Sequence, residues 1–237
     1  MAKVSAPHFK PEALAFLRAL ARNNRRDWFA TRKDTFDEVL KAPLLDIIDS
    51  VNTAMLSFAP AYVAAPKKVI RKLHRDTRFT HDKSPFKKHV AAWWSPPGFP
   101  KTSGGGFYFH ASPKELVIAA GVYKPEREQL LAIRMYLLDH HDELRRLLES
   151  RKLRQLLDEF EGSPLTRAPK GFPKDHPGIN FLLCRQWGVS ATLPAEGALA
   201  PTLVHEIVTR FRAAAPIVDL LNRPLLARLA AQKKSFF

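Results

Sequence analysis

The stretch GFYFHASPKELVIAAGVY, residues 106–123, decides the fold class of this 237-residue chain. Two runs of strand-forming residues flank the turn SPKE, in which the Ser-Pro step favours a change of direction. The pattern predicts a β-hairpin with strands at 106–111 and 116–123. Runs of branched and aromatic residues at 69–73 and 89–94 predict two further strands. Four strands with short connections indicate an antiparallel sheet.

Segments with helical periodicity precede and follow these strands, because apolar residues recur at spacings of three and four. The predicted helices are 11–22, one after Asn24 that includes Trp28 and Leu40, 44–58, 128–140, 142–160, 199–214 and 216–231. The proline-containing segment 163–178 predicts an extended loop. The order predicts a single α+β domain over 1–237, with helices at 11–58, a sheet at 67–123 and helices at 125–231.

The composition is that of a soluble globular protein, with 46% hydrophobic and 26% charged residues. We expect no membrane span, because no run of about 18 apolar residues exists. The single cysteine, Cys184, and the lack of a secretory signal pattern lead us to expect a cytoplasmic protein. The net charge of +15 favours an anionic partner.

Much of this positive charge lies in one segment, IRKLHRDTRFTHDKSPFKKH at residues 70–89. Apolar residues such as Phe79 and Phe86 can anchor the segment, and aspartates can orient its arginines through charge-assisted hydrogen bonds. The planar fork of arginine suits phosphate or carboxylate, whereas lysine acts as a mobile point charge. We therefore expect an anionic small molecule as the first partner. The residues predicted to bind it are Arg75, Asp76, Arg78, Asp82, Lys83, Ser84 and Lys87.

Two alternatives stay open for this segment. A non-catalytic interaction or structural domain could use the Asp and Arg side chains purely as a salt-bridge network, although unpaired cations would then repel one another. A nucleic-acid-binding domain would spread the same cations over an open surface and expose aromatic side chains for stacking. The aromatic candidates are Trp93, Trp94, Phe107 and Tyr108. No named nucleic-acid motif occurs in the sequence, so this reading ranks second.

Two other stretches are expected to lie behind the binding residues. Asn24 and Trp28 lie at and just after the start of the second helix, with helix capping and core packing as their alternative roles. Lys170 and Lys174 lie on the proline-containing loop.

The sequence assigns no catalytic residue, no metal and no cofactor. His205-Glu206 lacks the second histidine of a metalloprotease, since residue 209 is threonine. His140, His141 and Asp142 fall at a predicted helix junction, where a solvated helix end explains them better than a metal site. No feature of the sequence indicates the oligomeric state.

The segment RDTRFTHDKSPFKKH, residues 75–89, is similar to the signature of an uncharacterised bacterial and fungal family, domain of unknown function 2461. Residues 16–44, the glycine-rich hairpin at 105–125 and PKGFPKDHP at 169–177 resemble that family as well. This copy departs from the pattern at Phe86, where tyrosine is usual, and at Lys72 and His74. The resemblance implies one α+β domain with this segment at its centre, and it implies no assigned chemistry.

Overall fold

A computed structural model gives the structure of the chain and describes residues 6–78, 80–96, 98–99, 103–157 and 159–234. Phe79, expected to anchor the basic segment, lies outside the described residues. None of the described helices is both long and apolar enough to cross a bilayer.

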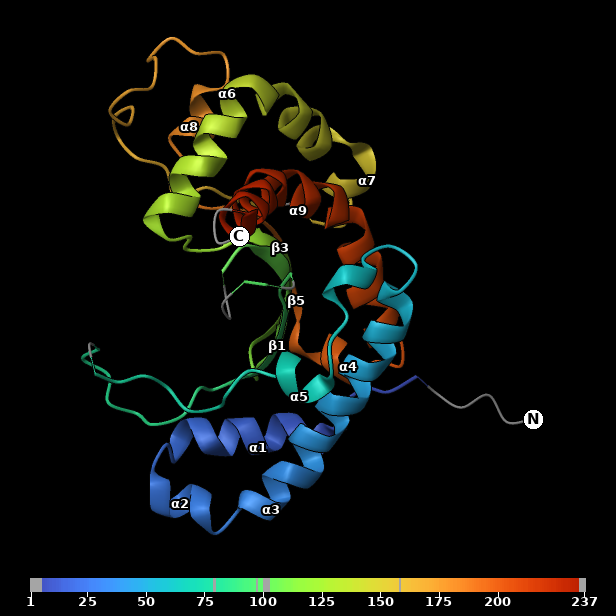
Figure 1. Cartoon of the computed structure of the whole chain (residues 1–237). Helices are drawn as coiled ribbons and strands as arrows, with labels where there is room; N and C mark the ends of the chain where they lie inside the picture. The colour runs from blue at the N-terminus through green and yellow to red at the C-terminus, as the bar shows by residue number, and fades with distance from the viewer. Residues whose placement is uncertain (1–5, 79, 97, 100–102, 158, 235–237) are drawn as a thin grey trace. The chain divides into compact units, whose positions relative to one another are not determined.

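A run of helices precedes the first three strands, and further helices lie before, between and after the last two strands (Figure 1). The helices before the first strand are α1 (Pro11–Arg22), α2 (Arg26–Ala30), α3 (Lys33–Phe36), η1 (Asp37–Lys41), α4 (Ala42–Met55), η2 (Pro60–Tyr62) and α5 (Pro66–Val69). The later helices are α6 (Arg127–Glu149), α7 (Arg151–Arg154), α8 (Ile179–Leu182), η3 (Ala195–Leu199) and α9 (Leu203–Lys234). The strands are β1 (Val90–Trp94), β2 (Gly105–Ala111), β3 (Glu115–Val122), β4 (Glu159–Glu161) and β5 (Trp187–Pro194).

The five strands form one antiparallel sheet in the order β1-β2-β3-β5-β4. This architecture confirms the predicted α+β class. The predicted hairpin is β2 and β3, and its turn is closed by the Ser112 N–H, which donates to the Glu115 carbonyl at 2.9 Å. At the other end of the sheet order, β4 pairs with β5 so that Phe160 lies opposite Val189.

Several predicted boundaries were wrong where long-range packing overrides the local pattern. The strand expected at 69–73 is not a regular strand, because α5 ends at Val69 and only single bridges follow. The helix expected at 142–160 is divided, since α6 runs unbroken through His140 and His141 and ends at Glu149. The helix junction predicted at these histidines therefore does not exist, and His141 is buried rather than solvated.

Strand β5 had no predicted counterpart, and β4 lies where a helix was expected. The two helices expected at 199–214 and 216–231 are the single helix α9, which contains Pro216 and Pro224. Proline inside a helix costs about 3 kcal/mol through a lost hydrogen bond and a clash. Both prolines are tolerated in α9, where the buried residues Ile217, Val218, Leu220 and Leu221 supply compensating apolar burial.

Internal contacts divide the chain into two compact units, so the single domain over 1–237 stays a prediction. The first unit contains the chain up to Trp93, Tyr108–Ile118 and Thr192–Val208. Its α1 buries an apolar stripe that includes Leu14 and Leu17, and α4 does the same with Ile47, Ile48 and Val51. The ring of Phe16 on α1 lies 5.7 Å from Trp28 on α2 and 5.9 Å from Phe36 on α3, which places these short helices beside α1 (Figure 1).

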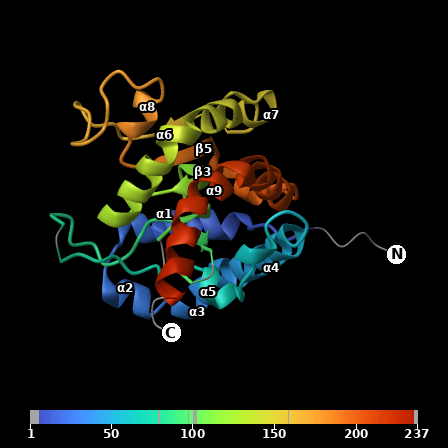
Figure 2. The same ribbon diagram turned by 45° about the horizontal axis from the view of Figure 1, so that its top comes forward.

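The second unit contains Trp94–Phe107, Ala119–Ala191 and Thr209–Phe237. Within it, Phe211 of α9 packs against Trp94 and Phe107, with ring centroids 5.4 and 5.1 Å apart. Helix α6 contacts both α7 and α8 (Figure 2). Gly121 has a φ of +128°, and a Cβ there would lie 2.1 Å from the Trp187 carbonyl oxygen, so β3 and β5 approach too closely for any side chain.

Candidate functional site

Residues 70–89, called the basic ribbon below, run antiparallel to themselves and to β1 without forming a regular ladder. The Arg71 N–H donates to the Ala91 carbonyl at 2.8 Å, and the backbone N–H of Lys87 donates to the Leu73 carbonyl at 2.8 Å. Isolated bridges pair Ile70 with Ala92 and His74 with Phe86. The segment therefore doubles back on itself with few backbone bonds.

The side chain of Asn24 supplies a clamp that the backbone lacks. Its Nδ2 donates to the Phe86 carbonyl at 2.9 Å, and its Oδ1 accepts from the Phe86 N–H at 3.0 Å. Helix capping was the alternative role considered for Asn24, but the N-cap of α2 is Arg25 and it makes no side-chain cap bond. Asn24 thus fixes the returning arm of the basic ribbon beside the segment that joins α1 to α2.

A second set of polar contacts organises the tip of the basic ribbon. Asp82 accepts hydrogen bonds from the Arg75 guanidinium, from the Ser84 hydroxyl and, at 2.9 Å, from the Ser84 N–H. Arg75 Nη1 also donates to Ser84 Oγ at 2.8 Å. The bonds from Ser84 and then from Arg75 hold the pKa of Asp82 well below its usual range. The carboxylate is therefore ionised at neutral pH and fixes the direction of the Arg75 side chain.

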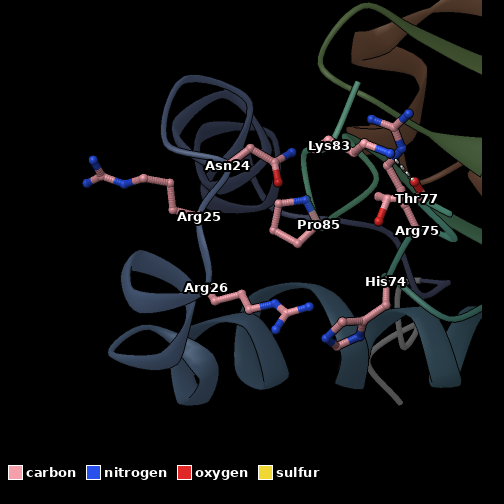
Figure 3. Close-up of a pocket in the computed structure, with 8 residues that line it drawn as sticks. All are labelled: Asn24, Arg25, Arg26, His74, Arg75, Thr77, Lys83 and Pro85. Atoms are coloured by element: carbon pink, nitrogen blue, oxygen red, sulfur yellow. Dashed lines mark hydrogen bonds between the residues drawn. The ribbon is translucent and has the colours of Figure 1, made fainter. Parts of the chain in front are cut away.

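A pocket of about 350 Å³ opens beside this network (Figure 3). Its lining residues come from the α1–α2 junction and from the basic ribbon, and they are Asn24, Arg25, Arg26, His74, Arg75, Thr77, Lys83 and Pro85. Four of these side chains are Arg or Lys and none is acidic. The Asp82 carboxylate at the tip of the basic ribbon already accepts a hydrogen bond from Arg75, one of these four cations.

The cations around the pocket differ in how they are held. Lys83 donates from Nζ to the Thr77 carbonyl at 3.0 Å, and Arg75 lies with its side chain 24% exposed. In Figure 3, Arg26 extends in the direction of the His74 ring, whereas Arg25 extends away from the other labelled side chains. Arg25 lies 3.7 Å from the Asp27 carboxylate. Arg26 has no ion-pair or hydrogen-bond partner among the residues that the structure describes.

The predicted binding residues are only partly brought together. Arg75, Lys83 and Asn24 line the pocket, and Asp82 and Ser84 orient Arg75. Four other predicted residues of the same compact unit are not part of the lining, and they are Asp76, Arg78, Lys87 and Trp28.

Asp76 and Arg78 bind each other, through Arg78 Nη2 at 2.8 Å and Nε at 3.0 Å. These bonds lower the pKa of Asp76 to about 2. Lys87 is half-buried, and its pKa is lowered by burial and by Arg71.

Trp28 packs against Phe16, and the Arg32 guanidinium lies 4.6 Å from the centre of the Trp28 ring. These contacts favour core packing, the alternative role of Trp28, over ligand binding. Lys170 and Lys174 belong to the second compact unit, so their grouping with the basic ribbon stays a prediction.

Five lining residues were not among the site residues predicted from sequence, and they are Arg25, Arg26, His74, Thr77 and Pro85. The clearest missed signal was Arg25-Arg26 directly after two asparagines, a cationic pair at a helix start where a capping residue is more common. Thr77 offers only a backbone carbonyl to Lys83, and no sequence pattern reports such a contact.

Comparison with known proteins gives one family. A family model described as "Conserved hypothetical protein (DUF2461)" matches residues 12–220. No curated protein and no solved structure matches the chain. Because the match covers α1 to the middle of α9, including the whole basic ribbon and all eight lining residues of the pocket, the chain belongs to the DUF2461 family of conserved hypothetical proteins.

Proposed function

We propose that the pocket of the basic ribbon binds a small anionic molecule that carries a phosphate or carboxylate group. The observation that carries this proposal is a lining with four cationic side chains and no acidic one. Asp82 already pairs with Arg75, and Asp27 lies near Arg25, which extends away from the others. Lys83 and Arg26 have no carboxylate partner among the described residues, so the pocket keeps a positive surplus that favours an anion. A cytoplasmic setting, in which Cys184 stays reduced, is part of the same proposal.

Arg75 is the central donor of the proposed site. Its Nη1 is used by Asp82 and Ser84, and the described residues make no bond to Nε or Nη2. A carboxylate that fixes one side of a guanidinium presents the remaining N–H groups in a set direction, which reduces the entropy lost on binding. Two oxygens of a phosphate or carboxylate match that fork.

Lys83 and Arg26 supply further positive charge to the proposed anion site. The Lys83 ammonium has three donors, and the bond to the Thr77 carbonyl uses one of them. Arg26 approaches from α2 and carries no partner in the described part of the chain. Asn24 uses its amide on Phe86. We therefore assign Asn24 to holding the pocket wall rather than to the ligand.

Two observations favour a small molecule over nucleic acid. The pocket volume of about 350 Å³ falls within the usual range of small-molecule sites. Of the aromatic side chains expected to stack on bases, Trp94 and Phe107 are fully buried. Stacking on exposed bases requires accessible ring faces.

Titration of the full chain with inorganic phosphate, followed by NMR, tests the proposal. Lys83→Ala removes one charge-assisted bond, and we expect phosphate affinity to fall by about tenfold or more. Lys88→Ala is the matched control, because Lys88 is an exposed lysine of the same ribbon that does not line the pocket.

A short single-stranded DNA serves as the competing probe. Binding of DNA but not phosphate, with a steep loss of affinity as salt rises and equal losses in both variants, would favour the nucleic-acid reading and reject the pocket.

A further inference from the structure

A second group of titratable side chains lies on β2 and β3, and none of them lines the pocket of the basic ribbon. Tyr108 and His110 are two residues apart on β2 and share its half-exposed face, while Phe109 between them is fully buried. The Tyr108 hydroxyl lies 3.1 Å from His110 Nδ1. On the other side of the ring, His110 Nε2 lies 3.5 Å from Glu115 Oε1.

The chemistry of these groups sets the direction of the hydrogen bonds. An ionised carboxylate only accepts, so Glu115 favours the tautomer of His110 with its proton on Nε2. Nδ1 then has a lone pair, and the Tyr108 hydroxyl donates to it. Phenol, imidazole and carboxylate thus stand in the order of a nucleophile, its base and the group that orients the base.

The surroundings determine where a positive charge can form. The His89 ring lies 4.7 Å from the His110 ring. Burial lowers the pKa of His89 to about 4, with smaller contributions from His110 and Lys87, so His89 is neutral at pH 7. Burial also lowers the pKa of His110, while Glu115 opposes that shift. A proton taken up by His110 therefore meets the Glu115 carboxylate and a neutral His89.

We propose that Tyr108, His110 and Glu115 form a proton relay that acts on a hydroxyl-bearing small molecule. In the forward step the Tyr108 O–H bond breaks and an N–H bond forms at His110 Nδ1. The resulting imidazolium is stabilised by Glu115, and the phenolate then accepts the proton of the ligand hydroxyl. These two transfers leave the ligand as an alkoxide, Tyr108 as a phenol and His110 as an imidazolium. The reverse transfers return each proton, so no oxidant or co-reactant is required.

The Tyr108, His110 and Glu115 side chains are not part of the pocket lined by Arg75, so this inference does not depend on the proposed function.

An aryl sulfonyl fluoride tests the relay without a known substrate. The phenolate oxygen of an activated tyrosine attacks the sulfur, the S–F bond breaks and fluoride leaves, so the label reports phenolate formation at each tyrosine by mass spectrometry. Tyr123 is the internal control, because it is 52% exposed and access alone would favour it. We expect Tyr108 to be labelled faster than Tyr123.

The variant His110→Gln removes the base, and we expect it to slow labelling of Tyr108 by about tenfold or more while the rate at Tyr123 is unchanged. Glu115→Gln, at a partly exposed position, should slow labelling by a smaller factor and keeps the test decisive if His110→Gln does not fold. Circular dichroism checks the fold of each variant. Labelling of Tyr108 no faster than Tyr123 in the natural chain, or an unchanged Tyr108 rate in a folded variant without the base, would overturn the relay.

Discussion

The basic ribbon and the β2–β3 hairpin are both antiparallel, yet different forces hold them. In the hairpin, Phe109, Leu116 and Ile118 are each fully buried, so apolar burial stabilises a regular ladder. Among the described residues of the basic ribbon, only Phe86 is buried to a similar degree, and its backbone is held by the amide of Asn24. The ribbon therefore rests on a few polar contacts.

This difference explains how the chain can carry a cationic pocket at all. A fully packed strand would leave no room for half-exposed arginine and lysine side chains around one volume. A segment held at single points can present them, and binding groups often occur on such segments supported by a rigid scaffold. The same feature makes the ribbon the part of the first unit that should open most easily.

The largest effect on stability should come from a substitution that leaves a cavity in the core beneath the hairpin. Phe109→Ala removes a fully buried ring, and we expect the free energy of unfolding to fall by about 3–5 kcal/mol. Denaturant unfolding followed by circular dichroism measures the change. Leu56→Ala is the control, since Leu56 is 60% exposed and should change stability by less than about 0.5 kcal/mol. If Phe109→Ala lowered the free energy of unfolding by less than about 1 kcal/mol, the hairpin would not be more rigidly held than the basic ribbon.

The hairpin was predictable because its information is local. Strand-forming residues flank a Ser-Pro turn within 18 residues, and Ser112 forms the turn bonds itself. The Arg78–Asp76 pair of the basic ribbon was predictable too, because its two residues are only two positions apart. The sequence placed Asp82 beside Lys83, whereas the structure pairs Asp82 with Arg75, seven positions away.

The rest depends on contacts between distant residues. The Asn24–Phe86 clamp joins positions 62 residues apart, so the local sequence favoured helix capping as the role of Asn24. Strand β5 contains Gly188, Ser190 and Ala191, which are weak strand formers, and it is defined by pairing with β3 and β4. No local pattern reports either arrangement.

A smaller effect should follow from releasing the clamp. Asn24→Ala leaves the N–H and the carbonyl of Phe86 without their partner, and we expect a loss of about 1–3 kcal/mol. Hydrogen exchange at the Phe86 amide should accelerate more than exchange at the buried strand residue Phe109, because the ribbon opens locally. Asn23→Ala is the matched control, since the Asn23 side chain bonds only to the Ala19 carbonyl of its own helix. Equal exchange rates in the two variants would contradict the clamp.

The smallest effect should be confined to the tip of the ribbon and should appear in acid. Since folding lowers the pKa of Asp82 below its ordinary value of 3.8, the stabilisation from this carboxylate is fully present above that value and is lost as the pH falls through the folded pKa. The Ser84 amide donates to Asp82 Oδ1, so its proton chemical shift, measured by NMR, should titrate with a midpoint well below 3.8. Ser84→Ala removes the largest cause of the shift, and the midpoint of the residue-84 amide should rise. The Arg78 amide, bonded to Asp76 with a pKa of about 2, should keep its midpoint in this variant. A midpoint near 3.8 in the natural chain would mean that Asp82 does not organise the ribbon, and the directed guanidinium of Arg75 would lose its support.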